Sequence, residues 1–163
     1  MVKLSTNFGD ITLELNAEKA PITVANFLQY VESGFYDGVI FHRVINDFMI
    51  QGGGFEPNMK QKSCKDEIKN EADNGLGNNN YTVAMARTSI PDSASSQFFI
   101  NIADNDFLNH TAPTSSGWGY CVFGKVVAGM DVVDKIKAVQ TTSKAGHRDV
   151  PIEPVIIEKA SVI

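Results

Sequence analysis

One short apolar stretch contains a charged side chain that could take part in catalysis. The sequence FHRVINDFMIQGGGF, at residues 41–55, places Arg43 among aromatic and aliphatic residues. Burying an unpaired charge is costly, so Arg43 either lies in solvent at a strand edge or lines a groove and acts there on a bound molecule. Taken alone, a strand arginine is more often solvated, so the residues that accompany it must decide between these roles.

The stretch SQFFINIA, at residues 96–103, has the pattern expected of a groove floor. Alternate side chains of a strand point to opposite faces. One face is uniformly apolar and is expected in the core: Phe98, Ile100 and Ile102. The other face carries Phe99 between the amides of Gln97 and Asn101, which predicts a surface with an apolar floor and hydrogen-bonding walls.

Two further short strands, FMIQ at residues 48–51 and GYCVF at residues 119–123, extend this surface by the same alternation. Two pairs are expected on the groove side: Met49 with Gln51, and Tyr120 with Val122. Their neighbours are expected on the opposite side: Phe48, Ile50, Cys121 and Phe123. A short helical turn at residues 105–108 would present Phe107 and Leu108 nearby.

The elements that must position these residues are mostly short strands. Alternating apolar residues on both sides of the turn NFGD predict a hairpin over residues 2–15. Apolar stripes predict one helix from Pro21 to about Gly34 and another over residues 130–139. Further strands are expected in VIFHRV, FMIQ, YTVAMAR, SQFFINIA, GYCVFGKV and PVIIEKASVI. This pattern predicts a closed barrel with a helix covering each end, and long loops at residues 54–80 and 104–119.

Length and composition predict a single domain over residues 1–163, and the protein is expected to be cytoplasmic and monomeric. The chain is 43% hydrophobic and 20% charged, as ordinary globular proteins are. No apolar run approaches the ~20 residues of a membrane helix, and the first residues lack the apolar core of a signal peptide. A net charge of −5 argues against nucleic-acid binding. Cys64 and Cys121 fit no zinc spacing and are expected to be reduced.

Several single motifs allow other functional interpretations, each with less support from the sequence. QGGGF could cradle a phosphate, but it lacks the lysine and the strand-to-helix context of a P-loop. Asp104 and Asp106 lack the full ligand spacing of a calcium loop. Ser95 or Ser96 with His42 has no nucleophile elbow. His42 is expected to point away from Arg43 and to serve the structure. The remaining histidines, His110 and His147, are expected in solvent.

Taken in order, FHRVINDFMIQGGGF, AMART, SSQFFIN, DFLN and YCVFGKVVAGMDVVDKI resemble a cyclophilin, most closely the bacterial cytoplasmic ones. The resemblance covers almost the whole chain. It implies an eight-stranded antiparallel barrel capped by two α-helices, and it implies peptidyl-prolyl cis-trans isomerase activity that assists protein folding. The implied partners are proline-containing peptides and protein clients. The activity needs no metal and no cofactor.

The resemblance also assigns residues. It gives Arg43 the catalytic role, and it gives the proline-ring pocket to four residues: Phe48, Met49, Phe99 and Leu108. The remaining substrate-binding positions are Gln51, Ala86, Arg87, Gln97, Phe107 and Tyr120. Phe107 stands where many eukaryotic members have tryptophan, which implies weak binding of cyclosporin. Tyr120 and Arg87 also replace common family residues, histidine and asparagine, and at Arg87 the family's contacts come from the backbone.

The chemistry of prolyl isomerisation fits an arginine beside an apolar pocket. Conjugation of the amide gives rotation a barrier of about 18–20 kcal/mol, and the catalyst must stabilise the twisted amide more than the planar one. Arg43 can donate a hydrogen bond to the prolyl nitrogen once that nitrogen regains its lone pair. A binding module that holds proline segments without turnover is the alternative, but it would have little need of a guanidinium in the pocket.

Overall fold

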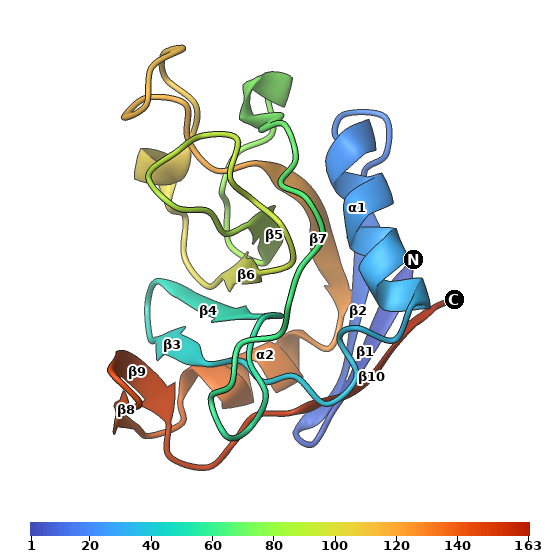
Figure 1. The fold of residues 1–163 in the computed structure, drawn as a ribbon, viewed down its shortest axis with the longest axis vertical. Helices are drawn as coiled ribbons and strands as arrows, with labels where there is room; N and C mark the ends of the chain where they lie inside the picture. The colour runs from blue at the N-terminus through green and yellow to red at the C-terminus, as the bar shows by residue number, and fades with distance from the viewer.

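The computed structural model describes all residues, 1–163, as one sheet with two helices and a separate hairpin (Figure 1). The eight-stranded sheet has the order β10-β1-β2-β7-β5-β6-β4-β3, and every neighbouring pair is antiparallel. Its strands are β1 (Val2–Thr6), β2 (Gly9–Leu15), β3 (Arg43–Ile45), β4 (Met49–Gly52), β5 (Thr82–Met85), β6 (Phe98–Asn101), β7 (Val122–Ala128) and β10 (Ile157–Val162). The mainly β architecture predicted from the sequence is confirmed.

The predicted closure of the barrel is not confirmed, because the sheet is open between its edge strands β3 and β10. The segments just before these strands approach each other instead. Ile40 and Ile156 form an isolated bridge, and the Phe41 amide donates to the Val155 carbonyl at 2.9 Å. The expected strand VIFHRV therefore contributes only its end, from Arg43, to the sheet. Three regular residues in β3 are too few to complete a ladder along β10.

Helix α1 (Pro21–Glu32) covers one side of the sheet, as Figure 1 shows beside β7. It begins at Pro21, a residue suited to the first helical position because it lacks the N–H that would have no partner there. Its apolar stripe buries Val24, Phe27 and Val31. The Phe27 ring lies 5.3 Å from the Phe98 ring, so the helix packs directly on the core face of β6. The prediction of this helix is confirmed.

Helix α2 (Met130–Lys137) is two residues shorter than predicted and buries Val132, Val133 and Ile136. It is preceded by Gly129, whose φ is +88°. A side chain at this position would place Cβ 2.2 Å from the Asp10 carbonyl oxygen, so the turn that brings α2 against β2 requires glycine. No helix of the chain has the length and apolar character needed to cross a bilayer.

A second sheet of two strands, β8 (Thr141–Lys144) and β9 (His147–Pro151), was not predicted. Its hairpin is largely exposed and polar, so it has no apolar alternation to reveal it. Val150 is an exception, since it packs with Ile40, Phe55 and Met59 in a small apolar cluster. The hairpin lies beside β3 (Figure 1), so it flanks the edge of the sheet that carries Arg43.

The main core lies on one face of the sheet and the candidate site lies on the other. Phe98, Ile100 and Ile102 belong to the core cluster, together with Cys121 and Phe123, as the alternation predicted. Phe99 belongs to a separate, smaller cluster whose four buried members come from four strands: Met49, Ala84, Phe99 and Val122. The predicted groove face therefore exists as a second apolar layer.

Candidate active site

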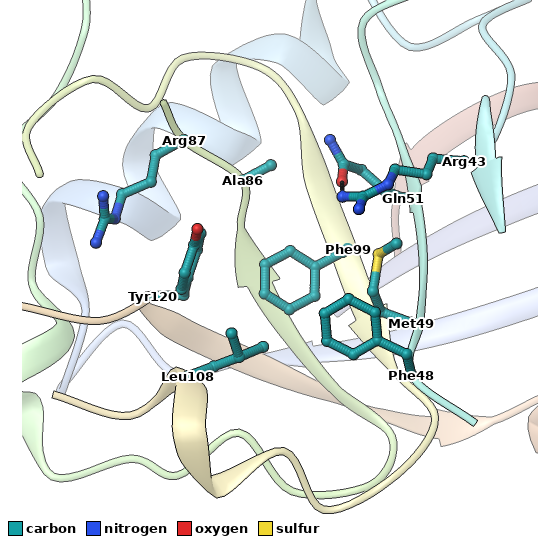
Figure 2. A pocket seen from close by; sticks show the side chains of 9 residues that line it. All are labelled: Arg43, Phe48, Met49, Gln51, Ala86, Arg87, Phe99, Leu108 and Tyr120. Atoms are coloured by element: carbon teal, nitrogen blue, oxygen red, sulfur yellow. Dashed lines mark hydrogen bonds between the residues drawn. The ribbon is translucent and has the colours of Figure 1, made fainter. Parts of the chain in front are cut away.

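Nine side chains from separated parts of the chain surround a cavity of about 120 Å³. Strands β3 and β4 and the turn between them provide four of them, and β6 provides Phe99. The others follow β5, lie in the 3-10 helix η2 (Asp106–Leu108) or precede β7. The nine are Arg43, Phe48, Met49, Gln51, Ala86, Arg87, Phe99, Leu108 and Tyr120 (Figure 2). All nine were singled out from the sequence.

The floor of this cavity is set by strand register. Phe99 pairs with Gln51 on one side and with Ala84 on the other, so its ring lies at the centre of three neighbouring strands. Met49 and Phe99 are buried, whereas Phe48, Leu108 and Tyr120 are partly exposed and pack around them. Figure 2 shows the Phe99 ring in the middle, with Arg43 and Arg87 on opposite sides. The result is an apolar depression with charged groups at its rim.

Phe48 does not follow the predicted alternation. It was expected opposite Met49, yet both residues line the cavity. Strand β4 begins only at Met49, so Phe48 belongs to the turn after β3 and is free of the strand's period of two. In the same turn Asp47 has φ +65°, and the Phe48 amide donates to the Ile45 carbonyl at 3.1 Å. The turn thus folds Phe48 back over the cavity.

A chain of side-chain amides holds Arg43. The Arg43 guanidinium Nη1 donates to Gln51 Oε1 at 3.4 Å, and Gln51 Nε2 donates to Gln97 Oε1 at 3.0 Å. Gly54 makes room for this arrangement, because a Cβ there would lie 2.6 Å from Gln97 Cγ. Arg43 itself is exposed, so its guanidinium is oriented at the rim while it remains hydrated.

Arg87 is turned away from the floor of the cavity. Its Nε donates to the Gly119 carbonyl at 2.9 Å, its Nη1 donates to the Thr88 carbonyl at 2.9 Å, and its guanidinium lies 4.6 Å from the Tyr120 ring centroid. The Tyr120 ring in turn meets Phe99 edge-on at 5.8 Å. The amide of Arg87 and the carbonyl of Ala86 have no hydrogen-bond partner within the chain. The two groups belong to one peptide unit and point in opposite directions, so a bound peptide can hydrogen-bond with one of them.

Two predicted site residues lie outside the cavity. Gln97 lines an adjoining polar cavity of about 270 Å³, which shares Gln51, Ala86 and Arg87 with the first. Phe107 is 74% exposed and stacks on Phe48 at 5.7 Å between ring centroids, so it extends the wall outward. The predicted helical turn that carries Phe107 is η2.

Residues 1–162 match the family model described as cyclophilin type peptidyl-prolyl cis-trans isomerase/CLD. The chain belongs to the cyclophilins. It is 65% identical over 162 residues to peptidyl-prolyl cis-trans isomerase cyp18 of Streptomyces antibioticus, covering 99% of this chain and 98% of that one. It is 62% identical to peptidyl-prolyl cis-trans isomerase B of Escherichia coli, covering 99% of both.

A crystal structure of a cyclophilin type isomerase from Cryptosporidium parvum, determined in the presence of the dipeptide Ala-Pro, is also similar. It superposes with a TM-score of 0.82 at 29% identity, covering 99% of this chain and 98% of that one. The resemblance stated from the sequence motifs is thus confirmed. This cyclophilin is a peptidyl-prolyl cis-trans isomerase, which decides against a binding module without turnover.

The polar cavity of this cyclophilin, beside the apolar one, is lined by several residues that were not predicted as site residues from the sequence. Gln61 and Glu67 come from the long loop at residues 54–80, and Thr88 and Ser93 come from the segment before β6. None of them lies in a regular element, so no periodicity marks them. The length of the loop was the one available signal, since long loops are often functional.

The histidines of this cyclophilin differ in their surroundings. His42 is 5% exposed, and its Nδ1 has no hydrogen-bond partner within the chain. Burial, together with the charges of His147 and Arg43, lowers the pKa of His42 to about 4. His42 is therefore neutral at pH 7. His110 was expected in solvent but is half-buried, with its Nδ1 2.9 Å from the Trp118 carbonyl, whereas His147 is exposed as expected.

Both cysteines are free thiols, Cys64 exposed and Cys121 buried. Burial raises the pKa of Cys121 to about 11, so its thiol stays protonated. Asp104 accepts a hydrogen bond from the Asn80 amide at 2.9 Å, which uses this carboxylate to hold a turn. No group of three or more His, Cys, Asp or Glu side chains in the chain is arranged to hold a metal ion.

Proposed function

We propose that the cavity over Phe99 binds the proline ring of the substrate and that Arg43 is the catalytic residue. The observation that carries this proposal is the joint placement of an apolar depression and an oriented guanidinium at its rim. Phe48, Met49 and Leu108 would enclose the ring. The apolar lining suits the ring, and the location of Arg43 suits the nitrogen to which that ring is attached.

The substrate's backbone would lie along the neighbouring polar groups. The free Arg87 amide can donate a backbone hydrogen bond to the carbonyl of a residue next to proline. Gln51 and Gln97, joined at 3.0 Å, provide further amide groups on the same side. Tyr120, which packs beside Arg87, and Phe107, which stacks on Phe48, would extend the two opposite walls of the groove. With one side of the prolyl bond held, the other can rotate.

Arg43 acts on the twisted state of the amide. When the bond twists, conjugation is lost and the prolyl nitrogen regains a lone pair, which can accept a hydrogen bond from a guanidinium N–H. In the planar substrate the nitrogen offers no such acceptor, so this bond stabilises the transition state selectively. Because Arg43 is exposed in the free enzyme, the bound peptide itself must displace water from the guanidinium and so strengthen the bond.

The size of the effect can be compared with what is required. Shortening the cis–trans conversion from tens of seconds to milliseconds requires the rate to rise by about four powers of ten. This corresponds to ~5.5 kcal/mol of transition-state stabilisation, at about 1.36 kcal/mol per power of ten. One charge-assisted hydrogen bond provides about 1.5–3 kcal/mol. The rest must come from holding the ring and the backbone in a geometry that is already close to that of the twisted state.

The substrates proposed are proline-containing segments of folding or folded proteins. The Cryptosporidium parvum relative was crystallised in the presence of Ala-Pro, which supports this substrate class. Assistance to protein folding, a cytoplasmic location, a monomeric state and weak cyclosporin binding remain predictions.

Exchange spectroscopy on a short Ala-Pro peptide tests this function. We expect the enzyme to accelerate cis–trans exchange of the peptide equally with and without EDTA, because the proposed chemistry uses only side chains and backbone of this chain. Exchange that stays at the uncatalysed rate over several residues before proline, or that requires a divalent ion, would contradict the proposal.

A further inference from the structure

Three buried asparagines lie behind the walls of the cavity. Asn78 and Asn101 are 0% exposed and Asn105 is 4% exposed. Asn101 lies on the same face of β6 as Phe99, two residues further along, so it continues the groove face under η2. Buried amides must find hydrogen-bond partners, and the partners of these three form a connected path.

One end of this path is the turn that carries Phe48. Asn105 Nδ2 donates to the Phe48 carbonyl at 2.8 Å and to Asn101 Oδ1 at 2.8 Å. Asn101 Nδ2 then donates to Asn78 Oδ1 at 3.0 Å. Both hydrogens of the Asn105 amide are thus used, one on a cavity residue and one on the next asparagine.

The other end is the wall opposite Phe48. Asn78 Nδ2 lies 3.0 Å from Asn109 Oδ1, 3.2 Å from the Tyr120 carbonyl and 3.3 Å from the Leu108 carbonyl, and it shares its two hydrogens among these three acceptors. Leu108 and Tyr120 are also joined directly, because the Tyr120 amide donates to the Leu108 carbonyl at 2.9 Å. Three cavity residues from three separate segments are therefore connected through three side-chain amides.

We propose that Asn105, Asn101 and Asn78 are positioning residues for the isomerisation, because they set the separation between Phe48 and the wall formed by Leu108 and Tyr120. The Phe48 carbonyl also accepts from the Ile102 amide at 3.1 Å, which joins the turn to the end of β6, but no backbone hydrogen bond joins that turn to η2. Backbone pairing alone therefore does not fix that separation. Hydrogen bonds are directional, and a fully satisfied buried network holds one geometry. This inference rests on the proposed function, in which the proline ring lies between these two walls.

Substitution Asn105→Ala tests the path at its link to Phe48. We expect kcat/KM for an Ala-Pro peptide to fall about 10-fold, mainly through a higher KM, because the ring would lose a fixed site. The matched control is Thr6→Val, at a buried position in β1 that does not line the cavity. The Thr6 hydroxyl donates to the Gly9 carbonyl and accepts from the Phe8 amide, and the substitution removes both hydrogen bonds. Both variants should melt at a lower temperature, but Thr6→Val should keep the wild-type KM.

A role that is only structural would lower the melting temperature and leave KM unchanged. The inference is therefore wrong if Asn105→Ala has a KM within about twofold of Thr6→Val at a temperature where both are folded. If Asn105→Ala does not fold, Asn105→Asp takes its place. Aspartate keeps the size of the side chain but, as a carboxylate, cannot donate to the Phe48 carbonyl, so the same increase in KM is expected. A KM within about twofold of that of Thr6→Val would again refute the inference.

Methyl NMR of the peptide-free enzyme separates this inference from the proposed function. Asn105→Ala should shift the signals of Met49 and Leu108, whereas Thr6→Val should not. If these signals do not move, the path does not position the cavity, even when the proposed function holds. If they move but a peptide leaves both residues unperturbed, the proposed ring pocket is wrong, and the inference fails with it.

Discussion

Replacement of Arg43 by lysine keeps the positive charge and removes the planar guanidinium. Arg43 is exposed, and its one side-chain hydrogen bond, to Gln51 Oε1, is long at 3.4 Å. The free energy of unfolding should therefore change by less than about 1 kcal/mol, as for other surface substitutions. Catalysis should respond differently, because a lysine ammonium is shorter in reach and more strongly hydrated than the guanidinium.

The size of the catalytic loss follows from the bond that is removed. A charge-assisted hydrogen bond to the prolyl nitrogen is worth about 1.5–3 kcal/mol, and ~1.36 kcal/mol corresponds to a factor of ten in rate. We therefore expect Arg43→Lys to lower kcat/KM by about 10- to 100-fold. Peptide affinity should fall less, because the apolar lining still holds the ring.

The assay is cis–trans exchange measured by NMR at several peptide concentrations, together with a binding titration on the same protein. Arg148→Lys is the matched control, since Arg148 is an exposed arginine in β9 that does not line the cavity. Its turnover should equal that of the wild type. If Arg43→Lys keeps near wild-type turnover, positive charge alone suffices, and the proposed role of an oriented guanidinium must be abandoned.

Two further predictions concern residues next to the site. The folded-state pKa of His42, about 4, lies below its unfolded value of 6.5. Its contribution to stability is therefore fully present above pH 6.5 and is lost as the pH falls toward 4, by about 2 kcal/mol between pH 7 and pH 5. Denaturant unfolding of His42→Gln should show a flatter pH dependence, and an unchanged slope would contradict this. Phe107 is exposed and offers no donor, so Phe107→Trp should bind cyclosporin more tightly, by roughly 1–3 kcal/mol, with little change in peptide turnover. Equal drug affinity in a calorimetric titration of the two proteins would refute that assignment.

The groove could be predicted from the sequence because its floor lies in regular strands. The alternation in SQFFINIA separated Phe99 from the core residues Phe98 and Ile100, and the structure places them in different clusters. A strand's period of two depends on local geometry alone, so it can be read without knowing the tertiary fold. The same holds for the apolar stripe of α1.

The features that escaped prediction depend on irregular backbone or on contacts between distant segments. Phe48 lies in a turn, where alternation does not apply. The gap between β3 and β10 depends on where each edge strand ends, which a hydrophobic pattern does not specify. Asn78 and Asn105 are polar residues in loops, and such residues are usually exposed. Their burial follows only from the packing of η2 over β6.

The central claim is that the proline ring lies on Phe99 and that Arg43 donates a hydrogen bond to the prolyl nitrogen. Intermolecular nuclear Overhauser effects between an unlabelled Ala-Pro peptide and the isotope-labelled enzyme test it most directly. We expect contacts from the prolyl ring protons to Phe99, Met49 and Leu108, and a shifted Arg43 side-chain N–H signal. Ring contacts to residues outside this cavity, or an Arg43 signal that peptide does not change, would contradict it.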